Sequence, residues 1–238
     1  MRQNLLCELP DCATCPARDH SVFAELQPLQ VDTLTTTKGC RTYSKGEIIF
    51  YSDTTPSGLF CVHHGTVKIY KVGRDGKEQT IRLAGQGDII GYRSLISGEK
   101  YMAFASPLEE AQLCHIPKDI FFGLAEKSAG LSTRVMKLLA DELRTAEQKL
   151  MEMAQKPLRE RLAETLLILK KTHGVQRDDV TLNITITRTE LANIVGTATE
   201  SVSRALSKMK EEGIIDVPGR KIMILNHRAL VEAANLDD

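Results

Sequence analysis

The stretch that decides the fold is residues 187–209, TRTELANIVGTATESVSRALSKM. Thr187 with Glu190 three residues later matches a capping box, in which a Thr and a Glu side chain together begin a helix. That first helix ends before Gly196, which permits a sharp turn. A second helix is predicted over about 199–212. Two short helices joined at a glycine turn are typical of a helix-turn-helix.

Polar side chains gather near the start of the second helix. Glu200, Ser203 and Arg204 lie at positions i, i+3 and i+4, so they share one side of it. The stripe expected to face the core consists of Val202, Ala205, Leu206 and Met209. In a helix-turn-helix this first turn and a half enters the major groove, where Arg reads guanine, Glu reads cytosine and Ser contacts either a base or a phosphate. The alternative is an ordinary solvated face with a Glu–Arg pair, which the position after a glycine turn disfavours.

The residues around this helix pair complete a unit predicted over residues 157–238. Leu158–Lys171 has leucines spaced for one face of an amphipathic helix. Ile214–Val217 and Lys221–Leu225 flank the turn signal Pro218-Gly219, so a β-hairpin is predicted and the unit is a winged helix-turn-helix. Further DNA contacts are expected from polar and basic residues of the helices and the wing: Arg188, Thr199, Lys208, Lys210, Arg220 and Lys221.

Residues 126–156 are predicted to form one long dimerisation helix. Its apolar residues recur three and four apart, which is a heptad seam; they are Met136, Leu139, Leu143, Ala146, Leu150 and Met153. Pro157 ends or kinks the helix. A parallel helix from a second chain buries such a seam most simply, so a homodimer is expected. The alternative is that the stripe packs on the β-rich part of its own chain.

Residues 21–125 contain short apolar runs separated by glycine turns. The runs predicted as strands are Glu47–Phe50, Leu59–Val62, Thr66–Tyr70 and Gln79–Leu83. Closely spaced short strands indicate an antiparallel barrel or roll. The predicted fold class is therefore α+β, with a β-roll, a long helix and a C-terminal winged helix-turn-helix in that order. Residues 1–20 contain cysteine and proline and show no clear period.

The composition is that of an ordinary globular protein. Lys and Arg number 31 and Asp and Glu number 31, so the formal net charge of zero gives no indication of nucleic-acid binding. No apolar run approaches the roughly 20 residues of a membrane span, and residues 1–9 lack the pattern of a signal peptide. No membrane association is therefore expected, and the expected location is cytoplasmic. No nucleophile–base set or phosphate-binding glycine loop is present, so an enzyme is not expected.

The order of these features resembles the CRP/FNR family of transcription regulators over about residues 20–230. Residues 187–204 and Gly213-Ile214-Ile215 carry the resemblance, and Glu200-x-x-Ser203-Arg204 is similar to the FNR subfamily. The resemblance implies a cyclic-nucleotide-binding-like β-roll, double-stranded DNA with a TTGAT inverted repeat, and RNA polymerase as a partner. A ligand-binding module without DNA binding is the alternative of another class, and the polar pattern after the glycine turn argues against it.

Two positions of the second helix differ from other family members. The cAMP-receptor form has Arg where Thr199 stands and Gly where Ser203 stands. The Ser or Thr that usually caps this helix aligns with Ala198, so Thr197 or Thr199 is expected to cap it instead.

The β-roll departs from the cAMP-binding members of the family. Those members carry Gly-Glu-Leu and, some residues later, Arg-Ser that holds the cyclic phosphate. This chain has Tyr92 and Arg93 after Gly91, and Tyr101-Met102 where Arg-Ser is expected. Cyclic AMP is therefore not expected as the effector. Arg93 is left either as an anion ligand or as an ordinary residue at the rim.

The cysteines are unevenly distributed: Cys7, Cys12, Cys15, Cys40, Cys61 and Cys114. Clustering in a cytosolic chain indicates metal or redox chemistry. The resemblance implies a [4Fe–4S] cluster held by Cys7, Cys12, Cys15 and Cys114, with Cys7 replacing the ligand that the family places near Phe23. Zinc binding and a thiol redox switch remain alternatives. The cysteines at 40, 61 and 114 also fit small buried hydrophobes of strands.

Overall fold

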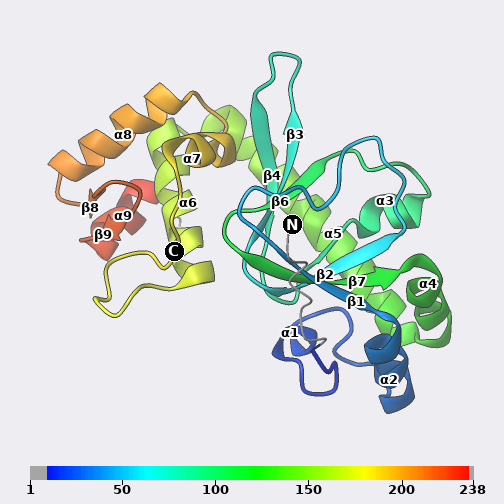
Figure 1. Ribbon diagram of the computed structural model, residues 1–238. Helices are drawn as coiled ribbons and strands as arrows, with labels where there is room; N and C mark the ends of the chain where they lie inside the picture. Colours follow the sequence, from blue (N-terminus) through cyan, green and yellow to red (C-terminus); the bar gives the residue numbers. More distant parts are fainter. Residues whose placement is uncertain (1–9, 236–238) are drawn as a thin grey trace, which may run out of the picture. The chain divides into compact units, whose positions relative to one another are not determined.

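The computed structural model describes residues 10–235 and contains two compact units. The first combines the chain up to Lys71 with Ile81–Arg144, and the second combines Val72–Thr80 with the chain from Thr145 onward. Figure 1 shows that strands dominate the N-terminal half of the chain and helices the C-terminal half. The predicted fold class, α+β, is confirmed.

The N-terminal half is built on two antiparallel sheets. They contain β1 (Gly39–Tyr43), β2 (Gly58–His64), β3 (Val67–Val72), β4 (Glu78–Ala84), β5 (Ile89–Ile90), β6 (Phe104–Pro107) and β7 (Ala111–Pro117). One sheet has the order β1-β7-β2-β5 and the other the order β4-β3-β6. Gly65, with φ of +84°, makes the turn between β2 and β3, and a Cβ there would lie 2.6 Å from the carbonyl oxygen of Glu110. The predicted strands at 59–62, 66–70 and 79–83 are thus present with small shifts of their ends.

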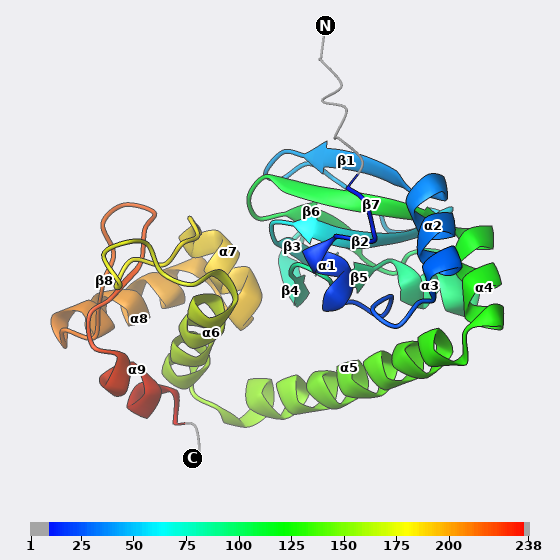
Figure 2. The same ribbon diagram turned by 90° about the horizontal axis from the view of Figure 1, so that it is seen from below.

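The sheet β1-β7-β2-β5 has an apolar layer on each face. Val62 and Leu113 belong to the core cluster between the strands of the roll. Cys61 and Cys114, their neighbours in sequence, belong to a second cluster with residues of the helices. Successive side chains of a strand point to opposite faces, so this alternation follows directly from the pleat. Figure 2 shows α1 and α2 beside the strands of this sheet.

The first unit contains more helix than the sequence predicts. The helices before the long one are α1 (Pro16–Asp19), α2 (Pro28–Thr37), α3 (Tyr92–Ser97) and α4 (Lys118–Lys127). The expectation of strands over most of 21–125 missed α2, α3 and α4, and α1 lies in the segment 1–20 for which no element was predicted. For α2 the signal was present, because Pro28 stands at the first helical position and Gln27 and Gln30 form a reciprocal cap.

The predicted strand Glu47–Phe50 is wrong. Only Phe50 pairs, as an isolated bridge to Ala105. The Glu47 carboxylate accepts a hydrogen bond from the backbone N–H of Ser44 at 3.0 Å, and the Glu47 N–H donates to the Ser44 carbonyl at 3.0 Å. This local turn holds the segment out of a ladder, so β1 forms earlier in the chain.

The long helix is α5 (Ala129–Gln155). The helix expected from residue 126 is in fact divided, because Ser128 has extended φ and ψ of −132° and 97° and separates α4 from α5. Much of the seam is exposed, with Met136, Leu143 and Leu150 at 61%, 62% and 71%. Leu139 packs against the core of the first unit. The alternative of packing on the chain's own β-rich part therefore holds for this seam residue and not for the three exposed ones.

The second unit is a helical domain with a small hairpin. Its elements are α6 (Leu158–His173), α7 (Arg188–Val195), α8 (Thr199–Glu211), β8 (Ile215–Asp216), β9 (Met223–Ile224) and α9 (His227–Ala234). β8 and β9 are antiparallel, with Ile215 opposite Ile224, so the predicted hairpin is present in a shorter form. The last helix, α9, was not predicted. Among residues 10–235, no helix is long and apolar enough to cross a membrane.

Candidate nucleic-acid interface and cysteine pocket

The turn between α7 and α8 forms as its local sequence predicts. The Thr187 hydroxyl accepts a hydrogen bond from the Glu190 N–H at 3.1 Å, and the Glu190 carboxylate accepts one from the Thr187 N–H at 2.6 Å. This capping box fixes the first residue of α7. Gly196 ends α7 with φ of 78°, in the left-handed region that glycine adopts without strain.

The start of α8 differs from the expectation. Its N-cap is Ala198, and no side-chain cap hydrogen bond forms there. The expected capping by Thr197 or Thr199 is therefore not observed. The Ser203 hydroxyl instead donates to the Thr199 carbonyl at 2.9 Å, which is a hydrogen bond inside the helix. The direction of α8 is set by the turn and by its buried face.

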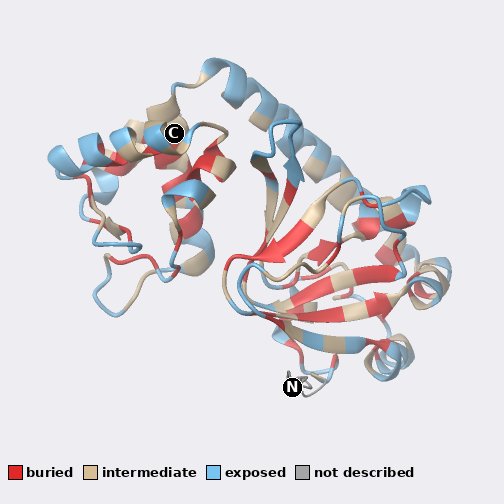
Figure 3. Ribbon diagram, turned by 45° about the horizontal axis from the view of Figure 1, so that its top comes forward, coloured by how far each residue is buried: buried red, intermediate tan, exposed pale blue. Residues whose placement is uncertain are grey.

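One face of α8 is buried and the opposite face is polar. Val202, Leu206 and Met209 are 0–2% exposed and form part of the domain core. Glu200 and Arg204 are exposed, and Ser203 is half-buried between them. In Figure 3 the buried stripe of α8 runs along one side and the exposed residues lie along the other. The packing thus leaves the three predicted base-reading residues on one accessible surface.

Four predicted DNA-contacting residues are also exposed. Arg188 is the first residue of α7, Lys208 lies in the last turn of α8, and Arg220 and Lys221 lie between β8 and β9. Arg188 and Arg220 line the same hollow. Two guanidinium groups along one hollow give this side of the domain a positive surface, although the chain as a whole is neutral.

Lys210 behaves differently from the other basic residues. Its ammonium group lies 2.7 Å from the carboxylate of Asp216. An exposed ion pair of this kind is easily broken, but it lowers the local positive charge. Lys210 is therefore a weaker candidate for a phosphate contact than Lys208.

In the first unit, which is called the sensor unit below, Arg93 contacts a carboxylate of the same chain. Glu142 of α5 accepts hydrogen bonds from Arg93 and from the Tyr92 hydroxyl, and it pairs with Arg82 at 2.7 Å. Burial and the neighbouring carboxylate raise the pKa of Tyr92. Tyr101 is buried and stacks on Phe50 at 4.0 Å between ring centroids. Tyr92 and Tyr101 thus occupy positions at which cAMP-binding family members carry nucleotide-holding residues, and Arg93 is paired with a carboxylate of the chain itself.

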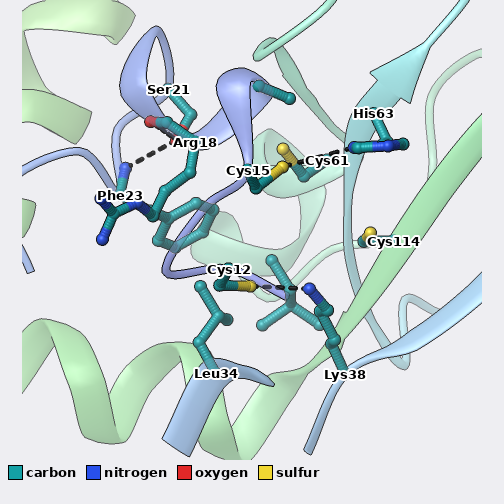
Figure 4. Close-up of a pocket in the computed structure, with 12 residues that line it drawn as sticks. Cys12, Cys15, Arg18, Ser21, Phe23, Leu34, Lys38, Cys61, His63 and Cys114 are labelled. Atoms are coloured by element: carbon teal, nitrogen blue, oxygen red, sulfur yellow. Dashed lines mark hydrogen bonds between the residues drawn. The ribbon is translucent and has the colours of Figure 1, made fainter. Parts of the chain in front are cut away.

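The sensor unit also brings four cysteines to one pocket. Cys12, Cys15, Cys61 and Cys114 are buried free thiols, and all four line it. Figure 4 shows Cys12 and Cys15 on the N-terminal segment, and Cys61 and Cys114 on two neighbouring strands. Cys7 lies outside the described residues. The sequence predicted that three of these cysteines bind one metal centre, but it did not include Cys61. Nothing in the local pattern around Cys61 indicates which strand lies beside it.

Two cationic or ionisable groups accompany these thiols. The buried ammonium of Lys38 donates to the Cys12 sulfur at 2.7 Å, and Nδ1 of His63 lies 3.3 Å from the Cys15 sulfur. Both contacts are drawn as dashed lines in Figure 4. Burial raises the pKa of Cys114 to about 11, although Lys38 acts against this rise. Burial and the adjacent cysteines also raise the pKa of Cys61.

The four thiols are suitable ligands for a soft metal centre, but their present spacing is not. Within the part of the chain that is described, no three Cys, His, Asp or Glu side chains are arranged to hold a metal ion. The pocket encloses about 20 Å³, which is room for one water molecule. A cluster takes one thiolate at each of four irons, so binding it requires a wider spacing of these thiols than the pocket has. The four thiols and the Lys38 charge otherwise fit an anionic cluster.

Comparison with known proteins decides the family. The cyclic nucleotide-binding domain matches residues 40–128, and the Crp-like helix-turn-helix domain matches residues 160–233. The fumarate and nitrate reduction regulatory protein of Vibrio cholerae is 31% identical over 194 residues, which cover 81% of this chain and 77% of that protein. The chain belongs to the CRP/FNR family of transcription regulators. The electron transport regulator A of Shewanella oneidensis is 30% identical over 78% of this chain and 74% of its own length.

Solved CRP/FNR structures share the fold. FixK2 of Bradyrhizobium japonicum superimposes with a TM-score of 0.74 at 24% identity, covering 84% of this chain and 99% of that chain. TTHA1359 of Thermus thermophilus gives a TM-score of 0.72 at 24% identity, covering 83% and 98%. CRP/FNR proteins are DNA-binding regulators that typically act as dimers, and they are not enzymes. This CRP/FNR chain is therefore a DNA-binding transcription regulator.

Proposed function

We propose that this CRP/FNR protein acts as a dimer, reads a TTGAT inverted repeat through α8, and responds to oxygen or redox state through a [4Fe–4S] cluster. The observation that supports the DNA-reading part is the polar face of α8, which carries Glu200 and Arg204 opposite buried Val202 and Met209. Such a face offers hydrogen-bonding groups to base edges while the core of the domain stays intact. The regulator then acts on RNA polymerase from its DNA site in the cytoplasm.

Each residue of the polar face has a separate role in this proposal. Arg204 donates two hydrogen bonds to O6 and N7 of the guanine of the half-site. Glu200 accepts a hydrogen bond from N4 of the cytosine on the opposite strand. Ser203, whose hydroxyl proton is used by the Thr199 carbonyl, accepts a hydrogen bond from a base amino group or contacts a phosphate after rotation.

The basic residues around α8 hold the phosphate backbone. Arg188 and Arg220 share one hollow, and Lys208 and Lys221 are exposed on the helix end and the wing. Thr199, in the first turn of α8, supplies a hydroxyl to the same backbone. These contacts set the position of the domain on DNA, and the three residues of the polar face supply the sequence preference.

Dimerisation through α5 brings two such domains to the two halves of the repeat. The exposed seam of Met136, Leu143 and Leu150 is the observation in its favour, because apolar side chains spaced three and four apart bury each other in a parallel pair of helices. An inverted repeat matches the twofold symmetry of such a pair.

The sensing part rests on the cysteines of the sensor unit. Cys7, Cys12, Cys15 and Cys114 are the ligand set that the resemblance implies, and the last three are represented in one buried pocket. A cluster bound there supplies a group that reacts with oxygen and changes its oxidation state. The chain itself provides thiolates and the Lys38 ammonium, which offsets part of their negative charge. Because thiolates replace thiols, binding of the cluster releases protons.

The test uses full-length protein purified without oxygen and assayed for iron, acid-labile sulfide and visible absorption. The expected protein is brown, contains iron and sulfide in equal amounts, and binds a fluorescent TTGAT inverted repeat more tightly than after exposure to air. Colourless, iron-free protein overturns the sensing part. Binding that does not distinguish this repeat from a scrambled one overturns the assignment of the DNA site.

A thiol switch without a cluster is the second candidate. The contact between Lys38 and Cys12 is in its favour, because it places a buried ammonium group directly beside one of the two thiols of the N-terminal segment. In that case anaerobic protein is colourless, and mild oxidation forms a reversible disulfide within the N-terminal segment. Peptide mass spectrometry without reduction detects that bond directly.

A further inference from the structure

Three cysteines lie side by side across the sheet of the sensor unit. Cys114 of β7 stands directly opposite Cys40 of β1 on one side and opposite Cys61 of β2 on the other. Residues directly opposite in antiparallel strands project from the same face, with Cβ atoms about 4.5–5.5 Å apart. All three therefore project from the face that packs on the N-terminal segment and the helices; Cys61 and Cys114 belong to that apolar cluster, and Cys40 packs against it.

The two outer members of this row differ in what they face. Cys61 lines the pocket that also contains Cys12 and Cys15, whereas the residues lining this pocket do not include Cys40. Cys40 is partly buried at the edge of the same cluster and is disulfide-bonded, whereas Cys61 is a free thiol. Among residues 10–235, the cysteines that line the pocket thus come from the N-terminal segment, β2 and β7, and Cys61 is the one from β2.

The alternative to a binding role is that Cys61 is a small apolar core residue. Its environment is unusual for that role, because three other thiols and a buried ammonium line the same small space. Four thiols around one pocket are the donor set that a [4Fe–4S] centre takes.

We propose that Cys61 supplies the fourth thiolate of the iron–sulfur centre, with Cys12, Cys15 and Cys114, so that Cys7 is not a ligand. This inference rests on the proposed cluster. It assigns two ligands to the N-terminal segment and two to neighbouring strands of a rigid sheet. Cys61 and Cys114 would hold the centre from paired strands of the sheet, and Cys12 and Cys15 would hold it from the N-terminal segment.

The test compares iron and sulfide content and visible absorption among anaerobically purified or reconstituted full-length variants. Cys61→Ser is expected to lose its iron and colour to the same extent as Cys114→Ser. Cys7→Ser and Cys40→Ser are the matched controls, and both are expected to retain the wild-type content. Cys61→Ala is included because it keeps the site apolar, and circular dichroism with thermal melting shows whether each variant is folded.

The outcomes separate this inference from the proposal on which it rests. Iron-free wild-type protein removes the cluster itself, and the role of Cys61 with it. If the wild type holds a cluster, retention of full iron by folded Cys61→Ala overturns the assignment of Cys61. Loss of iron from Cys7→Ser or Cys40→Ser shows a different ligand set and also overturns it. Folded Cys61→Ala without iron, beside both iron-loaded controls, supports it.

Discussion

The pair α7–α8 and the cysteine pocket represent two ways of building a functional site. The residues that set the geometry of the helix pair and its polar face all lie between Thr187 and Met209. That geometry follows from one capping box and one glycine. The pocket is assembled from segments about fifty residues apart, around Cys12 and Cys15, Cys61, and Cys114. Short-range hydrogen bonds thus determine the first site, and strand pairing determines the second.

This difference has consequences for mutation. A change within the helix pair acts on residues that are neighbours in sequence and belong to one compact unit. A change in the pocket acts on several segments at once, because the N-terminal segment, β2 and β7 share one apolar cluster. Mutations therefore measure how far each site depends on its surroundings, and the first of them is in α5, the proposed dimerisation helix.

The largest effect is expected from Leu143→Glu in the seam of α5. Leu143 is 62% exposed in the single chain, so the substitution leaves the fold of the chain intact but brings two carboxylates together in the dimer. Facing like charges cost several kcal/mol, which weakens dimerisation by about a hundredfold or more. Sedimentation velocity at micromolar concentration measures this. Lys137→Glu, on another side of the same helix, is the control and should remain dimeric; a dimeric Leu143→Glu would place the interface elsewhere.

Alkaline pH is expected to destabilise the cysteine pocket and not the helix pair. The folded state holds the pKa of Cys114 at about 11, above the usual value of 9.0. Since the unfolded chain loses this proton first, the free energy of unfolding falls as pH rises from about 9 to 11, by about 2–3 kcal/mol. Urea unfolding of reduced, metal-free protein at several pH values measures the slope. Cys114→Ala should reduce it, and an unchanged slope would contradict the buried position of this thiol.

Arg204→Ala tests the local site. Loss of a bidentate guanine contact is expected to cost about 1–3 kcal/mol per half-site and to relax the preference at that base, while the salt dependence hardly changes. Lys208→Ala is the matched control on the same helix and should weaken all sequences alike, with the salt slope reduced by about one unit. Fluorescence anisotropy with TTGAT repeats and single-base variants distinguishes these patterns. An unchanged ranking of sequences in Arg204→Ala would remove its role in base reading.

Thr187→Ala is expected to have a smaller effect, confined to the second unit. The hydroxyl of Thr187 caps α7 through the Glu190 N–H, and loss of an N-cap costs about 1 kcal/mol. Thermal unfolding should detect this decrease, while cluster content stays at the wild-type level. Thr189→Ala, at an exposed position of the same turn, is the control. A parallel loss of iron would show that the two sites are not independent.

Cyclic AMP is expected to produce no effect. Glu142 already accepts hydrogen bonds from Arg93 and Tyr92, and a cyclic phosphate brought to this place would face that carboxylate. Isothermal titration calorimetry should give no heat of binding at micromolar concentrations. Binding with a micromolar dissociation constant would contradict the role assigned to these residues.

The sequence by itself determined those features that depend on neighbours in the chain. The capping box at Thr187, the turn at Gly196 and the buried stripe of α8 follow from hydrogen bonds and periodicity over a few residues, and the structure contains them. The exposed seam of α5 follows in the same way from its heptad spacing. The local prediction was wrong at Glu47–Phe50. There the Glu47 carboxylate accepts a hydrogen bond from the Ser44 N–H, and this turn forms in place of the expected strand.

Only the tertiary structure decided which distant residues meet. Alternation along β2 indicates that Cys61 and Phe60 face opposite sides, but the register that sets Cys61 opposite Cys114 depends on pairing between strands far apart in sequence. The contact between Lys38 and Cys12 depends equally on how the N-terminal segment packs on the sheet. Periodicity specifies the face of each element, whereas the partner across that face is selected by packing of the whole domain, because many registers satisfy the same local pattern.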